Sequence, residues 1–443
     1  MDDPHAPLKD LARDLTPYPD PPDNQRVRAL LGADDKGQMQ IIAPEAALVD
    51  PEPIRNSTAR TLRSVPEAPD SRVCAIPGYY GLPSVIDRQL KEQPSVALAT
   101  EQPGDYVRVS GAQLAKMCDS HASFDTEFSR SLVPTPMAAE RDEQAILQAV
   151  DNFTRRRIQA RLDETLHIPP LPEAAQRIIA LQQETDYDLQ DLVEIVERDP
   201  AMAARIMGWA NSAFYGNNTP AKTLNDAIMR VLGFDLVFNM ALGMAIGATL
   251  NLPEHHVSGA SPYWLDAVYR AATMEALSHQ FDNKIIDTKQ QANPGLSYLT
   301  GLLSNFGTLV VGHVFPPQYE TICRIEEANP QLSHTYVDQH VLSINREVIA
   351  ANLLKQWAVP DPIVHGIRYQ YVDDYEGENA IYARLLSFAQ TLLAVDVPNH
   401  PHLPDHVMNE GVQLGLRVSG INEVADVLRQ SQAQLWDLAQ ALA

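Results

Sequence analysis

The pattern of apolar positions divides the chain into two regions with different expected secondary structure. In the N-terminal region the apolar residues form short runs separated by proline and glycine, which is typical of strands joined by turns. VRALLGADDKGQMQIIAP, residues 27–44, predicts two strands around a turn at Asp35-Lys36-Gly37. PSVALATEQPGDYVRVS, residues 94–110, predicts a second pair that turns at its Pro-Gly dipeptide, and GAQLAKMC after it predicts a closing helix. We therefore expect an α/β module in this region.

Helical periodicity dominates the rest of the chain. In DYDLQDLVEIVERD, residues 186–199, the apolar residues recur at i, i+3, i+4 and i+7, the spacing of one helix face. DPAMAARIM begins with Asp199, which suits an N-cap, and Pro200, which suits the first helical position. LLSNFGTLVVGHVF, residues 302–315, is predicted to be an apolar core helix that carries two adjacent polar residues. After about residue 142 we expect an all-α region.

These patterns give the chain a division into segments. Residues 26–118 form the α/β module, and residues 145–400 form the helical domain. Residues 119–144 have little periodicity and contain prolines, so they are predicted to be a linker. The flanks are an N-terminal extension, residues 1–25, and a C-terminal helical tail, residues 401–443. The expected fold class is a multidomain α+β protein.

Composition excludes several classes of protein. Hydrophobic residues make up 45% of the chain and charged residues 21%, which is ordinary for a globular protein. No run approaches the length of a transmembrane helix, so no membrane span is expected. The acidic start lacks the basic and apolar segments of a secretory signal. Three widely spaced cysteines, Cys74, Cys118 and Cys323, form neither a disulfide framework nor a zinc cluster. We therefore expect a cytoplasmic protein.

The charge balance bears on the partners of the protein. The chain has 34 basic and 57 acidic side chains, which gives a net charge of −23. Nucleic-acid-binding proteins usually present a basic surface, so DNA is not an expected partner. The sequence contains no P-loop, no GxGxxG after a strand and no GxSxG. We therefore expect no cofactor and no serine nucleophile.

The helical region carries a set of motifs in a specific order. PPLPEAAQRII, LVEIVERDPAMAARIM, WANSAFYG and IMRVLGFDLVFNMAL follow one another and closely resemble the HDOD family, over roughly residues 160–370. HDOD domains are all-helical relatives of the HD phosphohydrolases, found in bacterial signalling and output proteins, and most of them lack the metal site. The resemblance implies a regulatory role in which this domain binds a partner protein in a signalling pathway.

The metal-binding positions of the catalytic relatives are altered here. Those enzymes carry a His-Asp pair on a helix of the type LLHDIGKL, where this chain has LLSNFGTL, so that Ser304 replaces the histidine and Asn305 the aspartate. A hydroxyl and a neutral amide are weak ligands for such metals. The other positions that the resemblance assigns to this site are Asp266, Asn345, Gln370 and Tyr371. One carboxylate and no imidazole cannot assemble a two-metal centre, so we expect no bound metal.

Two interpretations of Ser304 and Asn305 remain open. A buried polar side chain without a partner costs about 1–3 kcal/mol, so both residues need partners. They can hydrogen-bond within the bundle and fill the former metal pocket, which is the interpretation we favour. Alternatively, the pocket holds a small ligand such as a nucleotide.

The N-terminal region also carries a resemblance. CAIPGYYGLPSVIDRQL, with QMQIIAPEAALVD before it and YVRVSGAQLAKM after it, resembles the YbaK/prolyl-tRNA deacylase family over about residues 26–118. These domains hydrolyse mischarged aminoacyl-tRNAs and have a glycine- and proline-bearing loop beside the substrate. The matching residues are Gly78, Tyr79, Tyr80, Gly81 and Pro83. The glycines permit a close backbone approach and the proline stiffens the loop, whereas the tyrosines either stack on an aminoacyl-adenosine or cap the core.

One further position bears on activity. The family commonly places a lysine on an early strand, and the matching residue here is Arg28, which does not replace a compact lysine charge. We therefore expect a YbaK-like module that senses an aminoacyl group or a related small molecule without catalysis. The alternatives are an editing deacylase with the HDOD domain as a regulatory tether, and a metal-dependent cyclic-dinucleotide phosphodiesterase.

Overall fold

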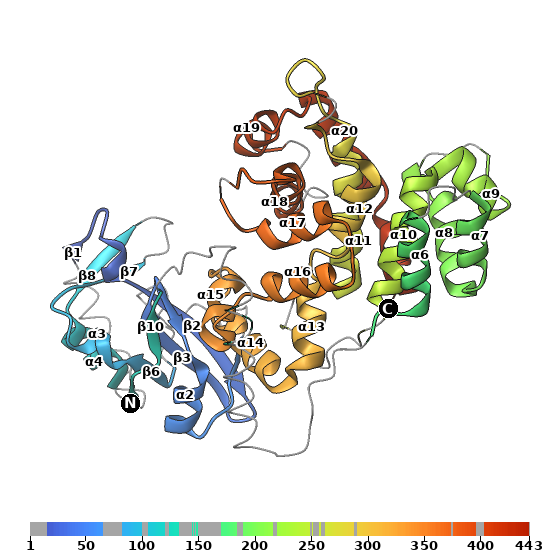
Figure 1. Cartoon of the computed structure of the whole chain (residues 1–443). Coiled ribbons are helices and arrows are strands. Elements are labelled where there is room, and N and C mark those ends of the chain that lie inside the picture. Colours follow the sequence, from blue (N-terminus) through green and yellow to red (C-terminus); the bar gives the residue numbers. More distant parts are fainter. Residues whose placement is uncertain are drawn as a thin grey trace, which may run out of the picture. The chain divides into compact units, whose positions relative to one another are not determined.

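The computed structural model divides the chain into two compact units (Figure 1). It describes residues 16–64, 82–99, 105–119, 124–132, 170–183, 189–215, 219–248, 262–287, 290–373, 375–395 and 403–442, together with a few isolated positions. Unit 1 comprises the described residues of Met1–Arg141, His255–Gly259 and Pro317–Ser343. Unit 2 comprises those of Asp142–Glu254, Ala260–Pro316 and Ile344–Ala443.

Unit 1 is built on a mixed sheet of eight strands and a separate strand pair. The strands are β1 Thr16–Pro17, β2 Arg26–Asp34, β3 Gly37–Pro44, β4 Ala47–Val49, β5 Arg63–Ser64, β6 Ser84–Asp87, β7 Val96–Ala99, β8 Tyr106–Val109, β9 Phe124–Thr126 and β10 Ser129–Ser131. The sheet order is β1-β8-β7-β2-β3-β6-β9, with β5 joined to β2, while β10 pairs with β4. The predicted hairpin is confirmed, since β2 and β3 are antiparallel and Asp34 pairs with Gly37. The predicted second pair, β7 and β8, is also antiparallel.

Two hydrophobic clusters cover the two faces of the central strands. In β3, Ile41 belongs to one cluster and Ile42 to the other, as expected of a strand whose side chains alternate. The Ile42 cluster includes Leu114 of α4, and the Ile41 cluster includes Ile54 of α2. The short helices of this region are α2 Pro51–Thr58, α3 Arg88–Lys91 and α4 Gly111–Asp119, the last of which was predicted from the sequence.

A segment distant in sequence completes unit 1. The helices α14 Pro316–Ala328 and α15 His334–Leu342 lie almost entirely in Pro317–Ser343, and Ala328 packs against the Ile41 cluster. The sequence analysis placed this segment in the helical domain, residues 145–400. One stretch of that range therefore folds with the N-terminal unit.

The predicted linker also contains structure. β9 and β10 lie within residues 119–144, and Phe128 between them is 2% exposed. The carboxylate of Asp87 accepts hydrogen bonds from the amides of Phe128 and Ser129, at 2.9 and 2.7 Å, and it also accepts from Gln89 at the start of α3. These strands are held by a distant side chain, which explains why the local sequence shows so little periodicity.

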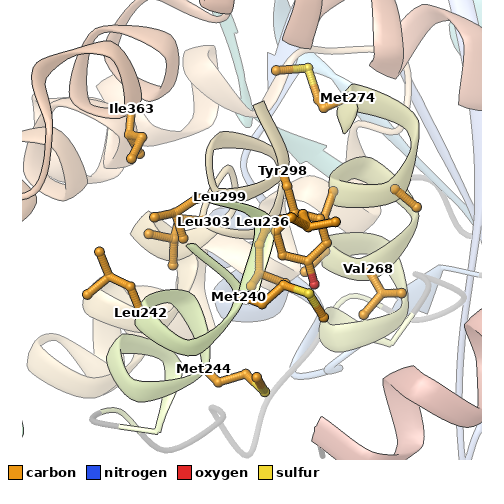
Figure 2. Packing of buried hydrophobic residues seen from close by; sticks show 14 of the residues in the cluster. Leu236, Met240, Leu242, Met244, Val268, Met274, Tyr298, Leu299, Leu303 and Ile363 are labelled. Atoms are coloured by element: carbon orange, nitrogen blue, oxygen red, sulfur yellow. The ribbon is translucent and has the colours of Figure 1, made fainter. Parts of the chain in front are cut away.

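Unit 2 consists mainly of helices. They are α6 Glu173–Gln183, α7 Leu189–Glu197, α8 Pro200–Ala210, α9 Leu224–Asp226, α10 Phe234–Gly247, α11 Tyr263–Ser278, α12 Pro294–Leu302, α13 Phe306–Val314, α16 Arg346–Gln356, α17 Asp361–Tyr369, α18 Ala380–Ala394, α19 Asp405–Gln413, α20 Val418–Gln430 and α21 Gln432–Leu442. Most of their buried apolar residues form one cluster (Figure 2). Leu435 and Leu438 of α21 belong to it, so the helices of the predicted tail share this core.

The helix α10 lies at the centre of this core. Twelve of its residues are buried, including Met240 and Leu242, so it is apolar on all sides. It begins after Gly233, whose φ of +83° favours glycine. No single helix among the described residues is long and apolar enough to cross a membrane. Only the bent pair Leu224–Leu232 and Phe234–Gly247 meets that length and composition, and it does so across a bend of 120°.

The start of α8 is as predicted from the residues around it. The carboxylate of Asp199 accepts from the amides of Ala201 and Met202, at 3.0 and 3.1 Å, and Pro200 is the first residue of α8. The prediction of one helix over residues 302–315 is wrong, because α12 ends at Leu302 and α13 begins at Phe306.

Candidate functional site

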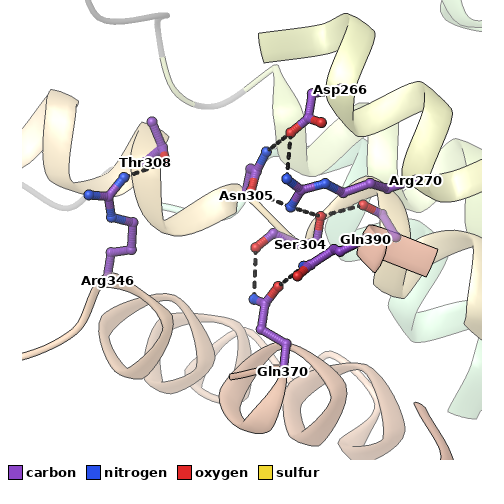
Figure 3. Close-up of polar contacts among 9 residues, drawn as sticks. Asp266, Arg270, Ser304, Asn305, Thr308, Arg346, Gln370 and Gln390 are labelled. Carbon is purple, nitrogen blue, oxygen red and sulfur yellow. Dashed lines mark hydrogen bonds and ion pairs between the residues drawn. The ribbon is translucent and has the colours of Figure 1, made fainter. Parts of the chain in front are cut away.

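The break between α12 and α13 places two predicted site residues in a turn. Ser304 and Asn305 lie in this turn, and the Ser304 hydroxyl donates to the carbonyl of Gly301 at 2.8 Å. A Cβ on Gly301 would lie 2.7 Å from the Cα of Ala271, so the absence of a side chain lets α11 and α12 approach closely. This approach brings Arg270, which precedes Ala271, beside the turn (Figure 3).

The guanidinium of Arg270 is the centre of a polar network. Its Nη2 lies 2.8 Å from Oδ2 of Asp266, one helical turn earlier on α11. Its Nη1 donates to Oδ1 of Asn305 at 2.7 Å and to Oγ of Ser304 at 3.4 Å. The Asn305 amide in turn donates to Oδ2 of Asp266. Arg270, Asp266 and Asn305 therefore form a closed ring in which one cation faces one carboxylate, and Ser304 is joined to it through Arg270.

A chain of amides continues the network toward α17 and α18. Nε2 of Gln370 donates to the backbone carbonyls of Ser304 and Ile367, both at 3.1 Å, and its Oε1 accepts from Gln390 at 2.7 Å. Ser304 and Gln370 are each 3% exposed, and these bonds supply their polar atoms with partners inside the bundle.

The remaining predicted positions lie at the edge of this network. Asn345 is the buried N-cap residue of α16, and Arg346 after it donates to Oγ1 of Thr308 at 3.4 Å. Tyr371 follows α17. Burial raises the pKa of its phenol, an effect that the positive charge of Arg270 opposes and the carboxylates of Glu347 and Asp266 reinforce. The structure thus brings Asp266, Ser304, Asn305 and Gln370 together.

These residues do not fit a two-metal centre. Oδ2 of Asp266 already accepts from Arg270 and Asn305, and Oδ1 of Asn305 accepts from Arg270. The guanidinium adds a positive charge at the position that the resemblance assigns to metal cations, which would repel them. The sequence analysis missed Arg270, although an Asp-Arg pair at i, i+4 on one helix was visible in YWLDAVYR.

In unit 1, Arg28 lies on β2 with its guanidinium held by the chain itself. Nη2 donates to Oδ1 of Asn329 at 2.7 Å and to the carbonyl of Ala47 at 3.1 Å, and Nη1 donates to Oε1 of Gln331. Burial lowers the pKa of the guanidinium to about 10, an effect that the Glu45 carboxylate opposes. Arg28 is therefore cationic at neutral pH.

Asn329, at the end of α14, fixes this arrangement. Its amide donates to the carbonyls of Val49 and Ile325, at 2.7 and 2.6 Å, and its Oδ1 accepts from the Val49 amide at 2.7 Å as well as from Arg28. All four hydrogen-bonding positions of the side chain are used, and the residue is 1% exposed. No local pattern predicts this role, because Val49 is 280 residues away.

The loop residues predicted to contact a ligand are only partly described. Gly78, Tyr79, Tyr80 and Gly81 lie outside the described residues. Pro83 precedes β6, and its carbonyl accepts from the amide of Gln40 at 2.9 Å. The described end of the predicted loop therefore leads directly into strand β6.

Unit 2 is a helical domain in which a serine, an asparagine and an arginine-bound aspartate lie at the positions that the resemblance assigns to metal ligands. The sequence model of the family described as HDOD domain matches residues 168–372. The chain belongs to the HDOD family, as its motifs predicted.

Two solved structures and a curated protein are similar to this chain. A putative signal transduction protein from Marinobacter aquaeolei VT8 is 31% identical, and the match covers 99% of this chain and 98% of that chain with a TM-score of 0.80. A putative phosphohydrolase from Shewanella amazonensis SB2B is 19% identical over 68% of this chain and 98% of its own, and its TM-score of 0.50 shows the fold alone. An uncharacterized protein of Treponema pallidum (strain Nichols) is 23% identical over 247 residues, which are 56% of this chain and 44% of the relative. The chain thus spans less than half the length of that relative.

The N-terminal region has a weaker match. A putative trans-editing enzyme for prolyl tRNA synthetase is 15% identical over 29% of this chain and 96% of its own, with a TM-score of 0.23. This match is consistent with the YbaK-like resemblance but too weak to carry an argument about function.

Proposed function

We propose that this chain is a non-catalytic regulatory protein of a signalling pathway, in which the HDOD unit acts by binding a partner protein. The observation that carries this proposal is the ring around Arg270. Its guanidinium uses the oxygens of Asp266 and Asn305 that a metal would need. A hydrolase of this class requires metal-activated water, which this arrangement does not support. The name of the Marinobacter relative, a signal transduction protein, agrees with a regulatory role.

We assign the sensing role to the N-terminal unit, with an aminoacyl group or a related small molecule as the ligand. Arg28 is the candidate contact within the described residues. Its guanidinium is half-buried, and the described partners that it donates to are neutral oxygens. A cation held in this way retains its attraction for an anionic group.

The editing deacylase is the second candidate, supported by the YbaK-like resemblance. It would require Arg28 and the loop at residues 78–83 to contact a charged tRNA end. The metal-dependent phosphodiesterase is the third, and the engaged oxygens of Asp266 and Asn305 weigh against it.

The test combines metal content with hydrolysis. The full chain is purified, incubated with Mn²⁺ and passed through a desalting column, and its metal content is measured together with hydrolysis of cyclic dinucleotides. We expect no stoichiometric metal and no hydrolysis. About two retained ions per chain with hydrolysis would overturn the proposal. Hydrolysis of mischarged aminoacyl-tRNA, lost in Arg28→Ala, would instead establish the deacylase.

A further inference from the structure

Residues 317–343 are attached to the rest of unit 1 by two kinds of polar contact. The first kind is buried and fixed. Asn329 makes a two-point bond to the backbone of Val49, and its four bonding positions are all used. On the other side of the segment, Nε2 of His340 lies 3.8 Å from Oδ2 of Asp50, the residue that caps α2. These contacts hold α14 and α15 in place.

The second kind is exposed and replaceable. Gln331 lies in the connection between α14 and α15, and it is an exposed residue. Its side-chain oxygen accepts from Nη1 of Arg28 in a contact that is open to solvent. Losing one such bond from a charged donor costs about 1.5–3 kcal/mol, and Gln331 can leave Arg28 without disturbing the buried bonds of Asn329.

The charge of Arg28 is not matched by these acceptors. Asn329, Gln331 and Ala47 each offer a neutral oxygen, and the Glu45 carboxylate, whose charge acts on the guanidinium, is not among its hydrogen-bond partners in the described residues. Its Nε is buried and has no hydrogen-bond partner among the described residues. The bond from the guanidinium to Gln331 already has an ionised donor, and an oxyanion at the same position adds the attraction between opposite charges. An oxyanion at Nη1 would therefore bind more strongly than the neutral amide oxygen of Gln331.

We propose that the guanidinium of Arg28 is a binding position for the phosphate group of a small ligand, and that Gln331 is its competitor from within the chain. Occupancy by phosphate displaces Gln331 and loosens the connection between α14 and α15, while Asn329 keeps α14 attached. The chain enters this segment from α13 and leaves it into α16, so the ligand acts on a segment that is continuous with the HDOD unit. This inference rests on the proposed sensing role of the N-terminal unit.

The experiment titrates inorganic phosphate into the full chain by calorimetry, in chloride buffer at constant ionic strength. Two substitutions of the exposed Gln331 should act in opposite directions. Gln331→Ala removes the competitor, and we expect affinity to rise about ten- to a hundredfold, the equivalent of one hydrogen bond from a charged donor. Gln331→Glu supplies an internal carboxylate for Arg28, and we expect binding to be lost. Gln89→Ala, at another exposed glutamine of unit 1, should bind as the wild type does.

Hydrogen exchange reports on the segment itself. Phosphate should speed exchange in peptides that span residues 329–333 of the wild-type chain, and it should have no such effect in Arg28→Met. Equal phosphate affinity in the wild type, Gln331→Ala and Gln331→Glu would overturn the proposal, as would the absence of binding in all three. Retained binding in a folded Arg28→Met would do the same. Retained metal or hydrolysis would contradict the proposed function and leave these phosphate results unchanged, so the two failures are distinguishable.

Discussion

Oδ2 of Asp266 receives both Nη2 of Arg270, at 2.8 Å, and the side-chain amide of Asn305. One oxygen thus joins a residue of α11 to the turn between α12 and α13. The guanidinium holds together side chains at positions that the resemblance assigns to metal ligands in the catalytic relatives. The following predictions test this arrangement and the way the two units are built.

Replacing Arg270 should destabilise unit 2. Arg270→Met removes the donor of Asn305 and the cation that faces Asp266, and Arg270 has only 16% of its side chain exposed. Leaving such groups without partners costs about 1–3 kcal/mol. The measurement is urea unfolding followed by tryptophan fluorescence, because all four tryptophans lie in unit 2.

Arg177→Met is the matched control for that variant. Arg177 pairs with Glu173 at the same i, i+4 distance, but the two side chains are 42% and 78% exposed. We expect a change of about 0.3–0.5 kcal/mol or less. If Arg270→Met and Arg177→Met lowered the free energy of unfolding equally, the ring around Arg270 would contribute no more to stability than a surface ion pair does.

Gly301 sets the distance between α11 and α12, so adding a methyl group there should destabilise unit 2. In Gly301→Ala the new Cβ meets backbone atoms of Ala271 at 2.7 Å. Overpacking of this kind costs about 1–3 kcal/mol. Gly208→Ala, on α8, meets no atom within 4 Å and should raise stability by about 0.4–1 kcal/mol. Thermal unfolding should shift in opposite directions for the two variants, and a shift in the same direction would contradict this account.

The pair of His279 and Glu275 makes the stability of unit 2 depend on pH. The hydrogen bond to Glu275, at 3.0 Å, raises the pKa of His279 above its usual value, an effect that burial opposes. A raised pKa stabilises the folded state below the unfolded pKa of about 6.5, and that contribution is lost as pH rises through the folded pKa. Wild type should therefore exceed His279→Gln in stability by more at pH 6 than at pH 8.5. A difference that is constant across this range would show that the histidine charge contributes nothing.

Asn329 should contribute more to the stability of unit 1 than the exposed Asn422 contributes to the stability of unit 2. Asn329→Ala leaves the amide and carbonyl of Val49 without partners, at a cost of about 1–3 kcal/mol. Hydrogen exchange of peptides that contain β4 should become faster. Asn422→Ala is the control, because that exposed amide donates only to the carbonyl of Val418 in the structure. Slow exchange of β4 in Asn329→Ala would contradict the role of this residue.

The features that could be predicted from the sequence are the local ones. The turn at Asp35-Lys36-Gly37 and the cap at Asp199 depend on a few consecutive residues, and both are confirmed. The HDOD motifs identified the helical region and aligned Asp266, Ser304, Asn305 and Gln370, which the structure brings together.

The features that escaped prediction depend on contacts between distant residues. Arg270 reaches Asn305, 35 residues away, only because Gly301 lets two helices approach. The bond between Asn329 and Val49 spans 280 residues, and no pattern in either segment indicates it. The break before Phe306 was missed because the residues around it are as apolar as those of a continuous helix.

Residues 317–343 belong to unit 1 although they follow much of unit 2 in the sequence. This arrangement affects which recombined genes would encode a stable protein. The N-terminal unit is encoded in pieces that flank part of the helical domain. A single recombination event near residue 140 would therefore join Val49 to a foreign α14 and separate Asn329 from the strand that it fits. Such chimaeras would lose the buried contacts of both partners, so the gene should be transmitted whole. The match to the Marinobacter relative covers 99% of this chain, so it spans both pieces of the N-terminal unit.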